Sequence, residues 1–156
     1  MREILFRGKR KDYNRWIEGY LYRLSEKLNP FIMIKNKGGM AFEVIPETVG
    51  QYTGMTDKNG KKIFEGDVVL YVDEEGYYPE EQCEFVGRIV FENGVFGIGT
   101  NDTMPLELDF CCECDTFVSL WELYWNLEAE GEMLRMIEVI GNIHNNPELL
   151  KEGGEV

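Results

Sequence analysis

The sequence is short of the residues on which most enzymatic chemistry depends. Its 156 residues contain a single histidine, His144, so every mechanism that needs an imidazole would have to use it. The residues around it, 141–145, have the pattern of a strand that ends in a turn. No G-x-S-x-G motif is present to place a nucleophilic serine. These shortages predict a protein that is not an enzyme, that has no catalytic residue and that uses no cofactor.

Long apolar runs are also missing. The densest apolar stretches, 31–34 and 68–72, are four or five residues long, whereas a bilayer-spanning helix needs about 20. The N-terminal residues lack the apolar core and small-residue cleavage site of a secretory signal. We therefore expect a cytoplasmic protein with no membrane partner.

Basic residues are few, and they are unevenly distributed. The net charge is −13, but residues 1–62 hold 13 Lys/Arg and 7 Asp/Glu, while residues 63–156 hold 3 and 22. The two regions therefore carry formal charges of +6 and −19. Such polarity is compatible with head-to-tail self-association or with a local nucleic-acid surface. The favoured interpretation is that it serves neither, because the two halves of a sequence usually interleave in a small fold.

The cysteines do not have the spacing of a disulfide framework, because three of the four are crowded at 111, 112 and 114. Free thiols are the favoured interpretation. The alternative is a structural zinc site, for which the candidate ligands are Cys83, Cys111, Cys114 and His144.

Short apolar segments separated by turn residues predict a mainly β fold. The length suits one domain over residues 1–150, followed by a disordered tail at 151–156. Asn59-Gly60 and Asn93-Gly94 are predicted turns, and the second is typical of a two-residue hairpin. The predicted strands are Glu3–Arg7, Arg15–Leu24, Pro30–Lys35, Ala41–Ile45, Asp67–Val72, Cys83–Phe91, Val95–Gly97 and Arg135–Asn142.

The region from Asp115 to Ala129 carries two conflicting periodicities. One set of apolar residues recurs at helical spacing after Asp115, a candidate N-cap. Another set alternates as in a strand, so helix and strand both remain open. Further on, Pro147 has the place of a first helical residue in a short terminal helix.

The segment from Glu43 to Val69 is rich in glycine but has the wrong spacing for a phosphate-binding loop or a calcium loop. It is better explained as turns and strands. Gly66 is expected to supply backbone freedom, and Asp67 to bond to nearby backbone amides.

A cluster of cations near the N-terminus is the candidate nucleic-acid site. It consists of Arg7, Lys9, Arg10, Lys11 and Arg15. Tyr13 and Trp16 lie among them, and aromatic rings can stack on bases while cations contact phosphates. The favoured interpretation is a charged turn between two strands, with Trp16 pointing into the core.

Several ordered blocks lie along most of the sequence: Arg2–Arg7, Val44–Gly54, Asp57–Lys61, Ile63–Val69, Gly87–Phe91, Asn93–Phe96, Glu138–Ile143 and Asn146–Leu150. Together these blocks resemble the YopX family of phage and prophage proteins. The resemblance implies SH3-like β-barrel elements, and the residue patterns after Asp115 and at Pro147 add one or two short helices in the C-terminal third. It implies a non-enzymatic accessory protein in a bacterial host, and together with the charge pattern it predicts a homo-oligomeric protein-interaction module.

Overall fold

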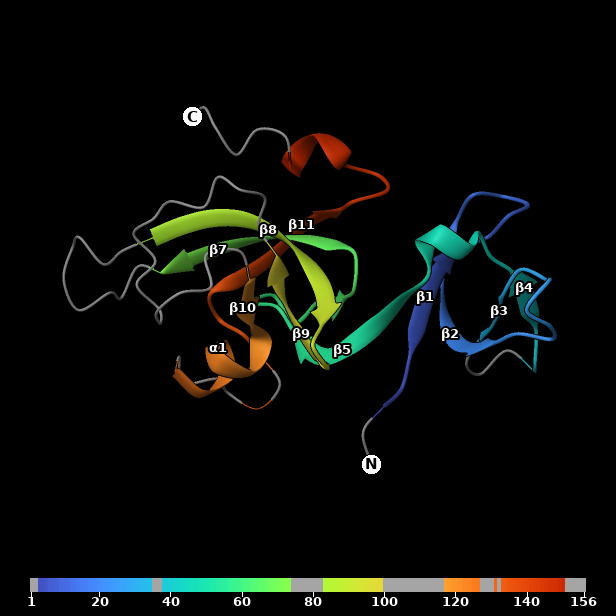
Figure 1. Cartoon of the computed structure of the whole chain (residues 1–156), viewed down its shortest axis with the longest axis horizontal. Coiled ribbons are helices and arrows are strands. Elements are labelled where there is room, and N and C mark those ends of the chain that lie inside the picture. Colours follow the sequence, from blue (N-terminus) through green and yellow to red (C-terminus); the bar gives the residue numbers. More distant parts are fainter. Residues whose placement is uncertain are drawn as a thin grey trace. The chain divides into compact units, whose positions relative to one another are not determined.

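The protein is mainly β in the computed structural model, which describes residues 3–34, 38–73, 83–99, 117–126, 131 and 133–150 (Figure 1). The chain divides into two compact units, Met1–Gly54 and Met55–Val156. The prediction of a single domain over residues 1–150 stays a prediction, and the expected tail at 151–156 lies outside the described residues.

The first unit is built on short strands joined in chain order. Its elements are β1 (Phe6–Lys9), β2 (Trp16–Tyr22), β3 (Phe31–Ile34), β4 (Ala41–Glu43), the 3-10 helix η1 (Pro46–Thr48) and the first part of β5 (Gly50–Thr56). These strands are hydrogen-bonded in the order β4-β3-β2-β1-β5. Just beyond β1 and β4, Arg10 and Val44 form an isolated antiparallel bridge. The residue after β1 is therefore bonded to the residue after β4, although β2 and β3 lie between β1 and β4 in the strand order.

The core of the first unit is small and depends on glycines. Leu5, Ile32, Val44 and Tyr52 are buried. At Gly19 an added Cβ would lie 1.9 Å from the carbonyl oxygen of Met33, on the neighbouring strand β3. Only glycine allows this close approach of β2 to β3.

The second unit contains a five-stranded antiparallel sheet and a short α-helix. Its elements are the end of β5, then β6 (Lys62–Phe64), β7 (Asp67–Asp73), β8 (Cys83–Glu92), β9 (Val95–Gly99), β10 (Phe117–Ser119), α1 (Leu120–Asn126), β11 (Ile137–Asn142) and the 3-10 helix η3 (Pro147–Leu150). The sheet order is β10-β9-β8-β7-β11. Strand β5 continues into this unit and adjoins β6.

One face of the second sheet packs into a larger apolar core. Its buried members are Ile63, Val69, Tyr71, Phe85, Ile89, Ile98, Leu120, Leu123, Leu134, Ile137 and Val139. The rings of Tyr71 and Phe85 stack with their centroids 4.8 Å apart. The helix α1, orange in Figure 1, contributes Leu120 and Leu123 to this core.

The predicted turns are confirmed. Asn93 and Gly94 have φ angles of 50° and 84°, the left-handed pair of a type I′ turn, and they join the cross-strand pair Glu92 and Val95. At the other turn, the Gly60 amide donates to the Asp57 carbonyl at 2.9 Å. Gly66 has φ 85°, which confirms the backbone freedom expected there.

The structure adds to the sequence-based expectation at two places. Residues 50–56, which were not among the predicted strands, form the strand β5, because pairing with β1 outweighs the weak strand preference of Gly50 and Gly54. The region 117–126 is neither all helix nor all strand, because β10 runs directly into α1. The expected cap Asp115 lies outside the described residues, and the Ser119 hydroxyl accepts the Trp121 amide at 3.1 Å at the start of α1.

Candidate functional site

The basic cluster of the N-terminal region lies on the β1–β2 hairpin of the first unit. The connecting residues 10–15 form a tight loop, in which the Arg10 amide donates to the Arg15 carbonyl at 2.8 Å. Asn14 has φ 54°, a left-handed conformation that asparagine tolerates better than most residues. The sequence thus correctly predicted a charged turn between two strands.

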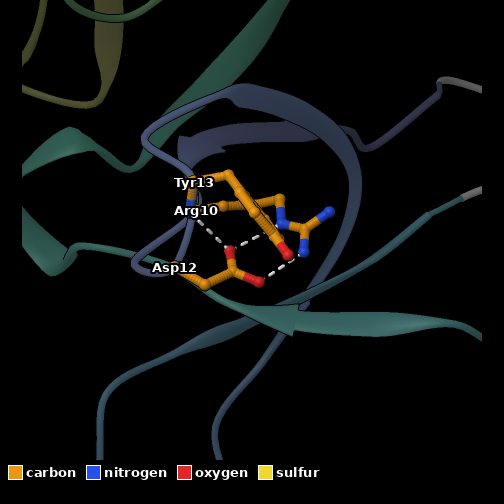
Figure 2. A network of polar contacts seen from close by, with 3 residues as sticks. All are labelled: Arg10, Asp12 and Tyr13. Carbon is orange, nitrogen blue, oxygen red and sulfur yellow. Dashed lines mark hydrogen bonds and ion pairs between the residues drawn. The ribbon is translucent and has the colours of Figure 1, made fainter.

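The guanidinium of Arg10 is held against the loop by an ion pair at the protein surface. It bonds to both carboxylate oxygens of Asp12, with Nε 2.8 Å from Oδ1 (Figure 2). It also lies 3.7 Å from the ring centroid of Phe42 and 5.0 Å from that of Tyr13. The hydrogen bond from Arg10 lowers the pKa of Asp12 below its ordinary value, and Asp12 in turn raises the pKa of Arg10.

Lys11 is also paired with a carboxylate. Its Nζ lies 3.1 Å from Oε1 of Glu43, which accepts a second bond of 2.7 Å from the side-chain amide of Asn29. The bond from Asn29, followed by the bond from Lys11, lowers the pKa of Glu43. Two of the five candidate phosphate-binding cations, Arg10 and Lys11, therefore already have anionic partners.

Arg7 and Lys9 are arranged differently, because both lie against the ring of Trp16. The Arg7 guanidinium is 4.9 Å and the Lys9 ammonium 5.6 Å from the Trp16 ring centroid. In the β1–β2 register Lys9 is directly opposite Trp16, so the three side chains share one face of the sheet. The fifth cation, Arg15, is exposed at the end of the loop.

The face that carries Trp16 is the outward face of the sheet, which corrects the expectation that Trp16 points into the core. Alternation along each strand places Gly8, Gly19 and Ile32 on the opposite face. These three residues are buried, whereas Trp16 is half-buried. The outward position follows from the register, which the sequence did not reveal.

The same register extends the outward face across β3. Tyr20 is paired with Met33 and Tyr22 with Phe31, and the rings of Tyr22 and Phe31 stack at 5.5 Å. Tyr20 is 47% exposed. We refer to this surface as the aromatic face, made up of Arg7, Lys9, Trp16, Tyr20, Tyr22 and Phe31. The sequence identified Arg7, Lys9 and Trp16 as a candidate site but not the aromatic residues beyond them. The alternation of residues along β2 could have placed Tyr20 and Tyr22 on the same face as Trp16.

The second unit exposes apolar side chains at the β8–β9 turn. Phe91 is 52% and Val95 39% exposed. Phe91 is the cross-strand partner of Phe96, with ring centroids 4.9 Å apart. We refer to residues 91–96 as the hairpin tip. On α1, Trp121 is 57% exposed and stacks on Tyr124.

Two carboxylates of the segment from Glu43 to Val69, those of Asp57 and Asp67, serve the fold. Asp57 is 1% exposed and accepts backbone amides from Asn59, Lys61 and Val139 at 2.9, 2.9 and 3.0 Å. Asp67 accepts the Phe64 amide at 2.8 Å, which confirms the expected bond to a nearby backbone amide. Both carboxylates act as structural acceptors within the second unit.

The zinc hypothesis stays a prediction. Cys111 and Cys114 lie outside the described residues, and Cys83 is described only as part of the backbone of β8. His144 lies in the turn after β11, where its amide donates to the Asn142 side chain at 3.1 Å. Within the described ranges no group of three or more His, Cys, Asp or Glu residues is placed to hold a metal ion.

The fold and these surfaces define a mainly β protein with an aromatic, partly cationic first unit and a strongly acidic second unit. The family model described as YopX protein matches residues 5–151, and the chain therefore belongs to the YopX family.

A solved structure, the crystal structure of protein EF1440 from Enterococcus faecalis, is 25% identical. The match covers 96% of this chain and 99% of that one, with a TM-score of 0.49. A comparison with curated proteins gave no match. As for membranes, none of the helices in the described ranges has the length and apolar character to cross a bilayer.

Proposed function

We propose that this protein is a non-enzymatic accessory protein that works through protein contacts and associates with further copies of itself. The observation that carries this proposal is the separation of charge between the two compact units. Residues 1–54 hold 10 Lys/Arg and 6 Asp/Glu, whereas residues 55–156 hold 6 and 23. Formal charges of +4 and −17 in one chain favour contact between unlike units of different copies.

Membership of the YopX family supports a phage or prophage origin, with the protein acting in the cytoplasm of the bacterial host. Induction of the prophage should then raise the abundance of the protein, which mass spectrometry of the host can follow. Constant abundance before and after induction would argue against this origin.

We also propose that the first unit is an SH3-like barrel element. The strand order β4-β3-β2-β1-β5, the 3-10 helix η1 before β5 and the bridge from Arg10 to Val44 support this assignment. The proposed function also includes the absence of catalytic activity. This is supported by the buried carboxylates of Asp57 and Asp67, which accept backbone amides within the fold.

Sedimentation velocity over a wide range of protein concentration tests self-association. We expect oligomers at physiological salt that dissociate at high salt, because screening weakens contacts between unlike charges. A strict monomer at every salt and protein concentration would refute the self-association.

Nucleic-acid binding by the β1–β2 hairpin is the second candidate. The contact of Arg7 and Lys9 with Trp16 favours it, because cations beside an aromatic ring suit a phosphate and a base. Against it, Arg10 and Lys11 are paired with carboxylates. Mobility-shift assays at low salt with single- and double-stranded DNA and RNA provide the test. No shift with any of them would eliminate this candidate.

A further inference from the structure

We propose that the aromatic face of one copy binds the hairpin tip of a second copy, which gives a head-to-tail assembly. This inference rests on the proposed self-association and names the two surfaces that make the contact.

The composition of the aromatic face is that of a protein interface. Tryptophan, tyrosine, phenylalanine, methionine and arginine are the residues enriched in the cores of such interfaces. Arg7, Trp16, Tyr20 and Phe31 provide four of these types, and Met33 lies opposite Tyr20 in the sheet. The face is therefore chemically suited to bury its rings against an apolar surface.

The charges on the aromatic face favour a protein over nucleic acid. Arg7 is directly opposite Glu18 in the register, so a carboxylate lies among the cations. A phosphate backbone would meet that negative charge, and affinity for nucleic acid depends on the number of phosphates neutralised. An acidic protein surface with a few apolar side chains, by contrast, needs to place its negative charge only beside Arg7 and Lys9.

The hairpin tip of a second copy offers such a match. Phe91 and Val95 supply exposed apolar side chains on the two faces of the tip. Phe91 shares one face with Phe96, and Val95 shares the other with Glu92, which supplies a carboxylate. The type I′ turn and the contact of Phe91 with Phe96 fix the shape of the tip in advance, which lowers the entropic cost of binding.

The alternative pairing of two aromatic faces would bring together two surfaces that each carry the cations Arg7 and Lys9 with the one carboxylate of Glu18. Like charges across an interface are unfavourable. The second unit carries a formal charge of −17 and is present once per copy. Charge complementarity therefore selects an unlike, heterologous contact, which generates rings or filaments.

The test uses one substitution on each surface of the full chain. Tyr20→Glu places a carboxylate on the aromatic face, and Phe91→Ser removes the exposed ring from the hairpin tip. The matched controls are Tyr13→Glu and Trp121→Ser, because Tyr13 is 71% and Trp121 57% exposed, outside both surfaces. Circular dichroism and thermal unfolding select the variants that remain folded.

We expect Tyr20→Glu and Phe91→Ser each to weaken self-association about tenfold or more in sedimentation velocity, and the controls to leave it unchanged. Mixing the two variants should restore one contact, between the intact face of the Phe91→Ser chain and the intact tip of the Tyr20→Glu chain. The mixture should then form a 1:1 heterodimer at protein concentrations at which each variant alone is monomeric. This recovery is specific to a heterologous contact.

The other outcomes overturn the inference in distinguishable ways. If the wild type is always monomeric, the proposed self-association fails together with it. If the wild type associates and either Tyr20→Glu or Phe91→Ser has no effect, self-association stands and these surfaces are wrong. If single-stranded oligonucleotides quench tryptophan fluorescence of the monomeric wild type but not of Tyr20→Glu, the aromatic face binds nucleic acid instead.

Discussion

In the first unit the carboxylates that hold the loops lie at the surface, whereas in the second unit they lie inside the fold. The side chains of Asp12 and Glu43 are 51% and 37% exposed. Asp57 and Asp67 are each 1% exposed. Water can replace the bonds of an exposed carboxylate, but a buried amide that loses its acceptor stays desolvated. Hydrogen bonds to carboxylates should therefore contribute much more to the stability of the second unit than to that of the first.

The apolar residues show a complementary contrast. The first unit buries few large side chains and presents Trp16 and Tyr20 on its outward face, while the second unit buries a larger set around Tyr71 and Ile98. A small core has little stability in reserve. The first unit should therefore be the easier one to unfold, and its glycines the most sensitive positions.

The largest effect is expected for Gly19→Ala. Its Cβ would lie 1.9 Å from the Met33 carbonyl oxygen, so backbone must move, at a cost of about 3 kcal/mol in the free energy of unfolding. Hydrogen exchange should show lost protection in β1 to β4 and retained protection in β7 to β9. The control is Gly8→Ala, whose Cβ would meet only side-chain atoms of Ile32 and Val44, at 3.2 Å. Equal protection in wild type and Gly19→Ala would contradict the expected clash.

The next effect is expected for Asp57→Ala in the second unit. Three backbone amides lose their acceptor, and the amide of Val139 is buried, so the free energy of unfolding should fall by about 2 kcal/mol. Urea denaturation measures this loss. Asp57→Asn keeps one acceptor oxygen and should lose less. If the alanine and asparagine variants were equally stable, the amide bonds would not be the cause.

A smaller effect is expected for Ser119→Ala. The hydroxyl caps the short helix α1 through its bond to the Trp121 amide, and loss of such a cap costs about 1 kcal/mol. Urea denaturation should detect the change, and Ser119→Asp should restore most of the stability. Failure of aspartate to do so would indicate that the hydroxyl does not act as a cap.

The smallest effect is expected from pH, through Asp12 and Glu43 in the first unit. Folding lowers both pKa values from their ordinary values of 3.8 and 4.5. Their contribution to stability is therefore fully present above about pH 4.5 and is lost as the pH falls through the lowered pKa values. Because both groups are exposed, the change should be slight. Asp12→Asn together with Glu43→Gln should flatten the acid limb of the unfolding curve, and an unchanged limb would contradict this assignment.

Local sequence signals predicted the local structure of this protein well. Asn93 and Gly94 form the expected hairpin turn, and Gly66 and Asp67 adopt the expected conformation and bond. In each case the residues that specify the structure are adjacent in the chain. The conformation of a turn depends on the backbone preferences of the few residues that form it, and these preferences follow directly from the residue types.

Features that depend on residues far apart in the chain were not predicted. Strand β5 forms because it pairs with β1, and Lys11 is neutralised by Glu43, 32 residues away. The aromatic face required the register that places Tyr22 beside Phe31. The candidate cations were correctly located on a hairpin, but their division into carboxylate-paired and ring-contacting groups depends on tertiary contacts.

The pairing of β7 with β11 has a consequence for folding during synthesis. In the register Tyr71 is opposite Ile137, so one edge of β7 has no native partner until 66 further residues have been made. At ribosomal rates of about 5–20 residues per second, this takes several seconds. The strand partners within the first unit, by contrast, have all been synthesised once residue 54 has left the ribosome. For this interval the first unit of the newly made chain can be complete while one edge of β7 is still unpaired. An unpaired strand edge is the kind of surface on which aggregation begins.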